Sequence, residues 1–92
     1  MKNLVKQEIL YSGRVQGVGF RHSVYTLARK QDVNGYVQNL DNGKVRLIVG
    51  GEHDSVNDLL KNVKSVWMNN ISNIQIMNLH AADNSVGFSV RY

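Results

Sequence analysis

Apolar residues recur along this chain with two periods: every second position in some segments, and every third or fourth in others. From 6 to 15 the period is two, although Leu10 breaks a clean alternation, so this segment is predicted to be a strand. Its regularly spaced apolar residues are Ile9, Tyr11 and Val15. Glycines then interrupt the pattern, and a helix is predicted to begin at Phe20 and to end near Asp32. The residues on its apolar face are Phe20, Val24, Leu27 and Ala28.

The middle of the chain predicts a β-hairpin followed by a second helix. Asn34-Gly35 marks a turn into an extended segment at 36–40, and the turn residues 41–43 separate it from alternating apolar positions in 45–49. Gly50-Gly51 is expected to close the hairpin, and Asp54 or Ser55 is expected to cap the next helix. Its apolar residues, at helical spacing, are Val56, Leu59, Leu60 and Val63.

Two further extended segments complete the pattern, one at 71–80 and one in which Phe88, Val90 and Tyr92 alternate with polar residues. The order is therefore β-α-β-β-α-β with a short last strand. It predicts an α+β fold, a ferredoxin-like sandwich in which two helices cover one face of an antiparallel sheet. Trp67, Met68 and Met77 are assigned to packing at a helix end and on the sheet.

Composition limits what such a chain can do. Its 92 residues are expected to form one domain, 1–92, with a single small site. The absence of cysteine excludes disulfides, thiolate nucleophiles and thiolate metal sites. No apolar run has the length of a signal peptide or membrane span, so we expect a cytoplasmic monomer without a membrane partner. The net charge of +4 favours anionic ligands without naming one.

The segment 13–21 reads Gly-Arg-Val-Gln-Gly-Val-Gly-Phe-Arg and lies between the first strand and the first helix. Glycines let successive backbone N–H groups converge on an anion, a helix N-terminus adds further donors, and Arg21 supplies a full charge. A nucleotide-binding Walker loop would need Lys and then Ser or Thr after its last glycine, but Gly19 is followed by Phe20 and Arg21. A dinucleotide fingerprint would need a third glycine where His22 stands. The segment predicts a phosphate site that does not bind a nucleotide.

This loop, together with Gly35-Tyr36-Val37-Gln38-Asn39 and Asp41-Asn42-Gly43, resembles the two signatures of the acylphosphatase family. The resemblance covers most of the chain, including a terminal segment at 87–91. It implies an enzyme that hydrolyses the carboxyl-phosphate bond of small acyl phosphates, giving a carboxylate and inorganic phosphate, with no metal and no cofactor. It also implies that Arg21 binds phosphate and that Asn39 positions the attacking water. The backbone of Gln16, Gly17, Val18, Gly19 and Phe20 would form the phosphate cradle.

Two positions and one short stretch depart from the family pattern. His22 replaces a common aromatic residue, Gln38 replaces a common basic residue, and the stretch from Trp67 to Asn70 lacks a frequent glycine-proline turn. They affect the expected loop shape and substrate preference, but neither catalytic group. Arg14 is expected to be a solvated or ion-paired surface residue. The three histidines, His22, His53 and His80, have no ligand spacing and are expected at the surface, so no metal site is predicted.

The alternative is a non-catalytic ferredoxin-like binding module, either RNA-binding or a protein regulatory domain. An RNA-recognition domain shares the element order, and this chain is basic. Such domains stack bases on aromatic residues of their first and third strands, whereas Val45–Val49 has none and Tyr11 alone is a poor substitute. The presence of both Arg21 and Asn39 argues against a silent regulatory domain. We therefore expect no nucleic-acid partner.

Overall fold

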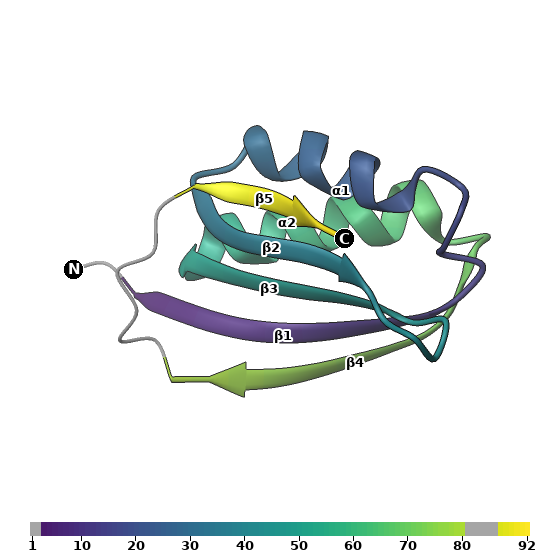
Figure 1. Cartoon of the computed structure of the whole chain (residues 1–92). Coiled ribbons are helices and arrows are strands. Elements are labelled where there is room, and N and C mark those ends of the chain that lie inside the picture. The colour runs from purple at the N-terminus through teal and green to yellow at the C-terminus, as the bar shows by residue number, and fades with distance from the viewer. Residues whose placement is uncertain (1–2, 81–86) are drawn as a thin grey trace.

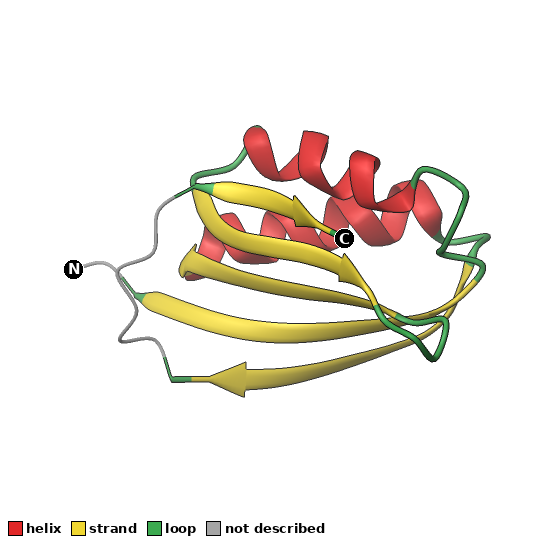
Figure 2. Ribbon diagram, viewed as in Figure 1, coloured by secondary structure: helices red, strands yellow, loops and turns green. Residues whose placement is uncertain are grey.

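The computed structural model describes residues 3–80 and 87–92. Its elements, in chain order, are β1 (Leu4–Gly13), α1 (Phe20–Arg29), β2 (Val33–Asn39), β3 (Val45–Glu52), α2 (His53–Trp67), β4 (Ile71–Leu79) and β5 (Phe88–Arg91). Both helices lie on the same face of one sheet (Figures 1 and 2). The ferredoxin-like order with a short last strand, predicted from the sequence, is confirmed. No helix in these described ranges has the length and apolar character needed to cross a membrane.

The strands lie in the order β4-β1-β3-β2-β5. The first four pair antiparallel, but β5 runs parallel to β2, with Gly35 opposite Phe88 and Gln38 opposite Arg91. The sheet is therefore mixed, and the short last strand is its one parallel partner among the described strands. Because β5 runs in the same direction as β2, it ends near the C-terminal end of β2 (Figure 1). This direction places Val90 and Tyr92 beside the loop that connects β1 to α1.

The core lies between the helices and the sheet. Its fully buried side chains come from the first three strands, both helices and the loop that follows β1. They are Ile9, Tyr11, Val15, Phe20, Val24, Ala28, Val37, Val45, Leu47, Val49, Val56, Leu59 and Val63. Phe20 stands edge-on to Tyr11 and Trp67, with ring centroids 5.1 and 5.2 Å away. These contacts fix the start of α1 against β1 and the end of α2.

The packing assignment is confirmed for Trp67, whose Nε1 also donates a hydrogen bond to Ser23 Oγ at 2.8 Å. It is wrong for Met68 and Met77, which are 67% and 58% exposed. Met68 lies just beyond α2. Ile76 pairs with the buried Ile9 and therefore points to the same face of the sheet, the one that the helices cover. Met77 is the next residue of the strand, so it points to the opposite face.

Several element ends differ from the predicted ones. β1 ends at Gly13, and Val15 is buried in the following loop rather than in the strand. α1 ends at Arg29, before the predicted end near Asp32. The segment expected at 71–80 ends one residue earlier, at Leu79. These shifts leave the order of the elements intact, and they place residues 14–19 of the glycine-rich segment in the loop between β1 and α1.

The Gly50-Gly51 pair lies inside β3 instead of closing the hairpin, so this prediction is wrong. At Gly51, with φ +146°, an added Cβ would approach Asp32 O to 2.9 Å. Glycine at this position therefore allows the start of β2 to approach β3 closely. The sequence pattern does not distinguish such a glycine from one in a turn. The strand continues to Glu52, and α2 begins at once at His53 with no side-chain hydrogen bond at its N-cap. The predicted cap at Asp54 or Ser55 is thus also wrong.

Candidate active site

A pocket of about 180 Å³ opens where the loop after β1 meets the N-terminal turn of α1, the end of β2 and the end of β5. Its lining residues are Val15, Gly17, Gly19, Phe20, Arg21, His22, Asn39, Val90 and Tyr92. Arg21 and Asn39, which are remote in sequence, thus line one pocket together with the glycines of the loop. Gln16 and Val18, also expected in the cradle, belong to the same loop but do not line this pocket.

The loop at 14–19 is attached to the body of the protein at both ends. Val15 and Phe20 are each 1% exposed, whereas Gly17, Val18 and Gly19 between them are exposed. At its start, Arg14 N donates to Asn70 O at 2.8 Å, and Asn70 Nδ2 donates to Arg14 O at 3.1 Å. The backbone in the middle of the loop is therefore accessible to a ligand while its two ends are held in place.

The N-terminus of α1 forms one wall of the pocket. Gly19 is its N-cap, with φ 85° and ψ 13°, a left-handed conformation that is strained for residues with a Cβ. The first intrahelical hydrogen bond comes from Ser23 N to Gly19 O at 3.0 Å. The N–H groups of Phe20 to His22 precede it and have no intrahelical acceptor. No side chain caps this turn and no acidic residue lies in it, so the N–H groups and the positive dipole end favour an anion.

Arg21 is held at the pocket by the end of the chain. Its Nη1 donates to Arg91 O at 2.9 Å, and its guanidinium carbon lies 4.7 Å from the centroid of the Tyr92 ring. Arg91 in turn stacks on Tyr36 of β2 at 3.6 Å, which ties β5 to its neighbour. The bond to Arg91 O uses a single N–H, so most of the planar guanidinium fork can still bind two oxygens of a phosphoryl group.

Asn39 is the last residue of β2 and is half-buried. Its Oδ1 is buried and has no hydrogen-bond partner in the described structure. A buried amide oxygen without a donor is costly, and most such atoms in native proteins are paired with protein or water. Asn39 lines the pocket, and its Oδ1 is an acceptor left without a donor among the described residues.

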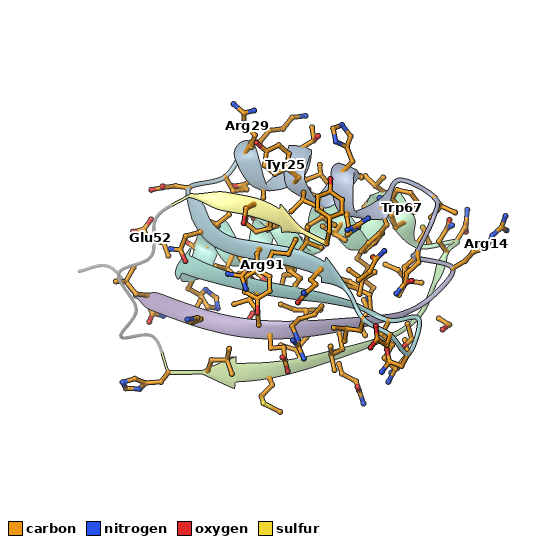
Figure 3. All side chains as sticks on the ribbon, in the orientation of Figure 1. Arg14, Tyr25, Arg29, Glu52, Trp67 and Arg91 are labelled. Atoms are coloured by element: carbon orange, nitrogen blue, oxygen red, sulfur yellow. The ribbon has the colours of Figure 1, made fainter. Side chains whose placement is uncertain are left out.

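Arg14 and the three histidines lie at the surface, as the sequence predicts. Arg14 is exposed and points away from the molecule at the outer end of its loop (Figure 3). His22, His53 and His80 are exposed. Over residues 3–80 and 87–92, no three His, Asp or Glu side chains cluster in a way that could hold a metal ion. Tyr11, which could have served as a base-stacking residue, is 1% exposed and belongs to the core.

Four pocket residues were not assigned to the site from the sequence: Val15, His22, Val90 and Tyr92. His22 could have been found as the residue next to Arg21 in the first turn of a helix that binds an anion at its N-terminus. Val90 and Tyr92 carry no such signal, because their place depends on the pairing of β5 with β2.

Comparisons with known proteins identify the family of the chain. The acylphosphatase family model matches residues 7–90. An acylphosphatase of Caldivirga maquilingensis is 34% identical over 90 residues, covering 96% of this chain and 95% of the relative. The crystal structure of acylphosphatase from Bacillus subtilis has a TM-score of 0.85 at 29% identity and covers 96% of this chain and 99% of that one. An acylphosphatase structure from Coxiella burnetii has a TM-score of 0.81 at 34% identity, with 97% and 94% covered. The chain belongs to the acylphosphatase family.

Proposed function

We propose that, in this acylphosphatase, the backbone of Gln16 to Phe20 and the side chain of Arg21 bind the phosphoryl group of an acyl phosphate, while Asn39 positions the attacking water. The observation that carries the proposal is that Asn39, whose buried Oδ1 has no partner among the described residues, lines the same pocket as Arg21 and the N-terminus of α1. The pocket thus combines anion-binding groups with one neutral acceptor. Hydrolysis of a phosphorylated substrate can use the first to hold the phosphoryl oxygens and the second to orient water.

The phosphoryl site is argued from charge and shape. The phosphoryl transition state spreads negative charge over its equatorial oxygens, so catalysis depends mainly on positioning and electrostatic stabilisation. The N–H groups of the first turn of α1 and the guanidinium of Arg21 supply positive charge from two directions. Because the guanidinium is planar, it can contact two oxygens at once, which the ammonium of a lysine does not reproduce.

The role of Asn39 follows from what an amide can and cannot do. Its Oδ1 accepts a hydrogen bond from water and its Nδ2 donates, but the group does not titrate near neutral pH. Asn39 therefore orients the water without acting as a base. The water oxygen bonds to phosphorus, and the bond from phosphorus to the carboxyl oxygen breaks with its electron pair leaving on the carboxylate. Both protons of the water remain on the phosphate product or exchange with solvent.

The leaving group explains why the pocket needs no general acid. A carboxylate has a conjugate-acid pKa of about 4, so it departs without being protonated. For the same reason, no metal ion is needed to stabilise it, and we propose a metal-independent reaction without a cofactor.

The family membership does not favour the binding-module alternative. Three properties stay predictions: one domain at 1–92, a monomeric state and a cytoplasmic location. Size-exclusion chromatography would test the monomeric state.

Release of inorganic phosphate from acetyl phosphate, measured in excess EDTA, tests the proposal. We expect release well above the spontaneous rate for the wild type and a loss of about a hundredfold or more in Arg21→Ala and Asn39→Ala. Arg14→Ala removes the same charge as Arg21→Ala, but from an exposed position in the loop at 14–19, and should retain activity within about twofold. A wild type no faster than the spontaneous reaction would refute the activity. Loss of activity on chelation alone would refute metal independence.

The roles of the two residues can be separated by inhibition with inorganic phosphate. Arg21→Ala should weaken phosphate binding strongly, because the variant loses charge-assisted hydrogen bonds to the ligand. Asn39→Ala should lower kcat while the inhibition constant of phosphate changes by about threefold at most. An equal loss of phosphate affinity in both variants would contradict the proposed division of roles.

A further inference from the structure

The side chain of Gln16 joins the phosphate-binding loop to the β2–β3 turn. Its Nε2 donates to Leu40 O at 2.8 Å and to Lys44 O at 2.9 Å. The amide nitrogen has two hydrogens, and both are used in these bonds. The side-chain nitrogen of Gln16 is therefore not available to phosphate, and any contribution of this residue to the cradle comes from its backbone.

The β2–β3 turn also closes through its own backbone. Leu40 N donates to Lys44 O at 2.8 Å, and Gly43 N donates to Leu40 O at 3.2 Å. Both carbonyl groups that accept from Gln16 thus keep a backbone donor if the Gln16 amide is removed. The two Gln16 bonds therefore do not build the turn. They determine where the turn lies relative to the loop at 14–19.

Asn39 directly precedes Leu40, so a link to Leu40 O constrains the backbone position of Asn39. Asn70, the other residue that binds this loop through its side chain, connects it to the α2–β4 turn instead. Among the side-chain hydrogen bonds of residues 3–80 and 87–92, those of Gln16 join the loop at 14–19 to the turn at 40–44. One amide therefore couples the part of the site that binds phosphate to the part that binds water.

We propose that Gln16 is a positioning residue for hydrolysis: its side-chain amide sets the distance and direction from Asn39 to the phosphoryl site. This inference rests on the proposed function, in which Asn39 holds the attacking water. Attack on phosphorus requires the water to lie in line with the leaving oxygen, and a misplacement of about 1 Å can cost about a hundredfold in rate. Loss of the Gln16 amide should accordingly reduce kcat with little effect on phosphate binding.

The first experiment compares Gln16→Met with the wild type. Methionine has a similar length and volume but cannot donate to either carbonyl group. We expect kcat for acetyl phosphate to fall about tenfold or more, while the inhibition constant of inorganic phosphate changes by about threefold at most. Asn70→Ala, which removes the other side-chain bond to this loop, is the matched control and should stay within about twofold of the wild type in kcat. An unchanged kcat in Gln16→Met would overturn the proposal.

A double-mutant cycle distinguishes positioning from general damage. If Gln16 acts through Asn39, Gln16→Met should lower kcat by less than about twofold in an Asn39→Ala background, because no oriented water remains to be misplaced. If the two losses multiply, Gln16 acts independently of Asn39 and the proposal is wrong. A loss of phosphate affinity in Gln16→Met that parallels the loss of kcat would overturn it as well, because it would place the effect in the phosphate-binding loop.

Two further measurements keep the test decisive. Gln16→Asn retains the amide but is one methylene shorter and cannot reach both carbonyl groups, so it replaces Gln16→Met if that variant does not fold. The side-chain amide signal of Asn39 in a ¹⁵N NMR spectrum reports its environment without any assay. It should shift in the Gln16 variant and not in Asn70→Ala, and an unshifted signal would overturn the linkage. An inactive wild type would refute the proposed function separately from this result.

Discussion

Individual residues contribute different chemical groups to the pocket. Arg21 brings charge, Asn39 brings a neutral acceptor, and the glycines bring exposed backbone. Gly19 adopts a left-handed conformation at the N-cap of α1, where nothing lies within 4 Å of an added Cβ. Glycine is therefore favoured there by backbone conformation and not by a lack of space. The same turn of chain thereby offers N–H groups to a ligand and starts the helix that carries Arg21.

Replacement of Arg21 by lysine tests whether shape matters in addition to charge. Arg21→Lys keeps the positive charge but loses the planar fork, so we expect kcat/KM to fall about tenfold to a hundredfold. The temperature of unfolding should stay within a few degrees of the wild type, since Arg21 is not part of the core. Steady-state kinetics and thermal unfolding measure the two effects. Full activity of Arg21→Lys would show that a point charge suffices.

The rate should depend little on pH around neutrality. His22 is the one histidine among the residues that line the pocket, and the proposed mechanism gives it no proton to transfer. We expect kcat to be flat from about pH 6 to 8 in the wild type and in His22→Gln. A step near pH 6.5 in the wild type that disappears in His22→Gln would assign His22 a role in the reaction.

At the scale of elements, the site is the meeting point of α1, β2 and β5. The periodicity of the sequence predicted each of these elements, because a buried face imposes a regular spacing on apolar residues. It placed element ends less well: Val15 fits the alternation of β1 but is buried in the loop, and Gly51 resembles a turn residue but lies in β3. In both cases tertiary packing uses the residue in a way that the local pattern does not encode.

The contact between β5 and α1 leads to a prediction for Tyr92. This residue is 94% exposed, but its ring lies 4.7 Å from the guanidinium carbon of Arg21. An exposed cation–π contact contributes about 0.5–1 kcal/mol, so Tyr92→Ala should raise KM for acetyl phosphate by about twofold to fivefold through a less ordered Arg21. Because Tyr92 is exposed, the urea midpoint of unfolding should change little. An unchanged KM would show that the bond from Arg21 Nη1 to Arg91 O orients the guanidinium by itself.

At the scale of the whole molecule, Tyr11 is a titratable group within the core. It is 1% exposed and packs against Phe20, and burial raises the pKa of its phenol above the usual value. In the unfolded chain the phenol loses its proton near pH 10, whereas in the native protein it stays protonated. Above about pH 10 the unfolded state therefore binds fewer protons than the native state, and stability falls as the pH rises.

Urea unfolding between pH 9 and 11.5 measures this dependence. The wild type should lose stability more steeply above about pH 10 than Tyr11→Phe, by up to about 1.4 kcal/mol per pH unit. Tyr92→Phe provides the control, because it removes the phenol of an exposed tyrosine and should follow the wild type. Equal slopes in the wild type and Tyr11→Phe would contradict the burial of this phenol.

The sequence by itself determined the order of the elements, the helical face that begins at Phe20 and the family signatures that contain Arg21 and Asn39. These features are local, since each depends on residues close together in the chain and on a repeated burial of one face. The resemblance assigned Arg21 and Asn39 to one reaction, and the tertiary structure shows how they come to line one pocket. Tertiary structure alone decided that β5 pairs parallel to β2 and that Gln16 binds the turn after Asn39. Such contacts join residues that are remote in sequence, and no local spacing records them, because they arise only when the sheet and its two helices pack together.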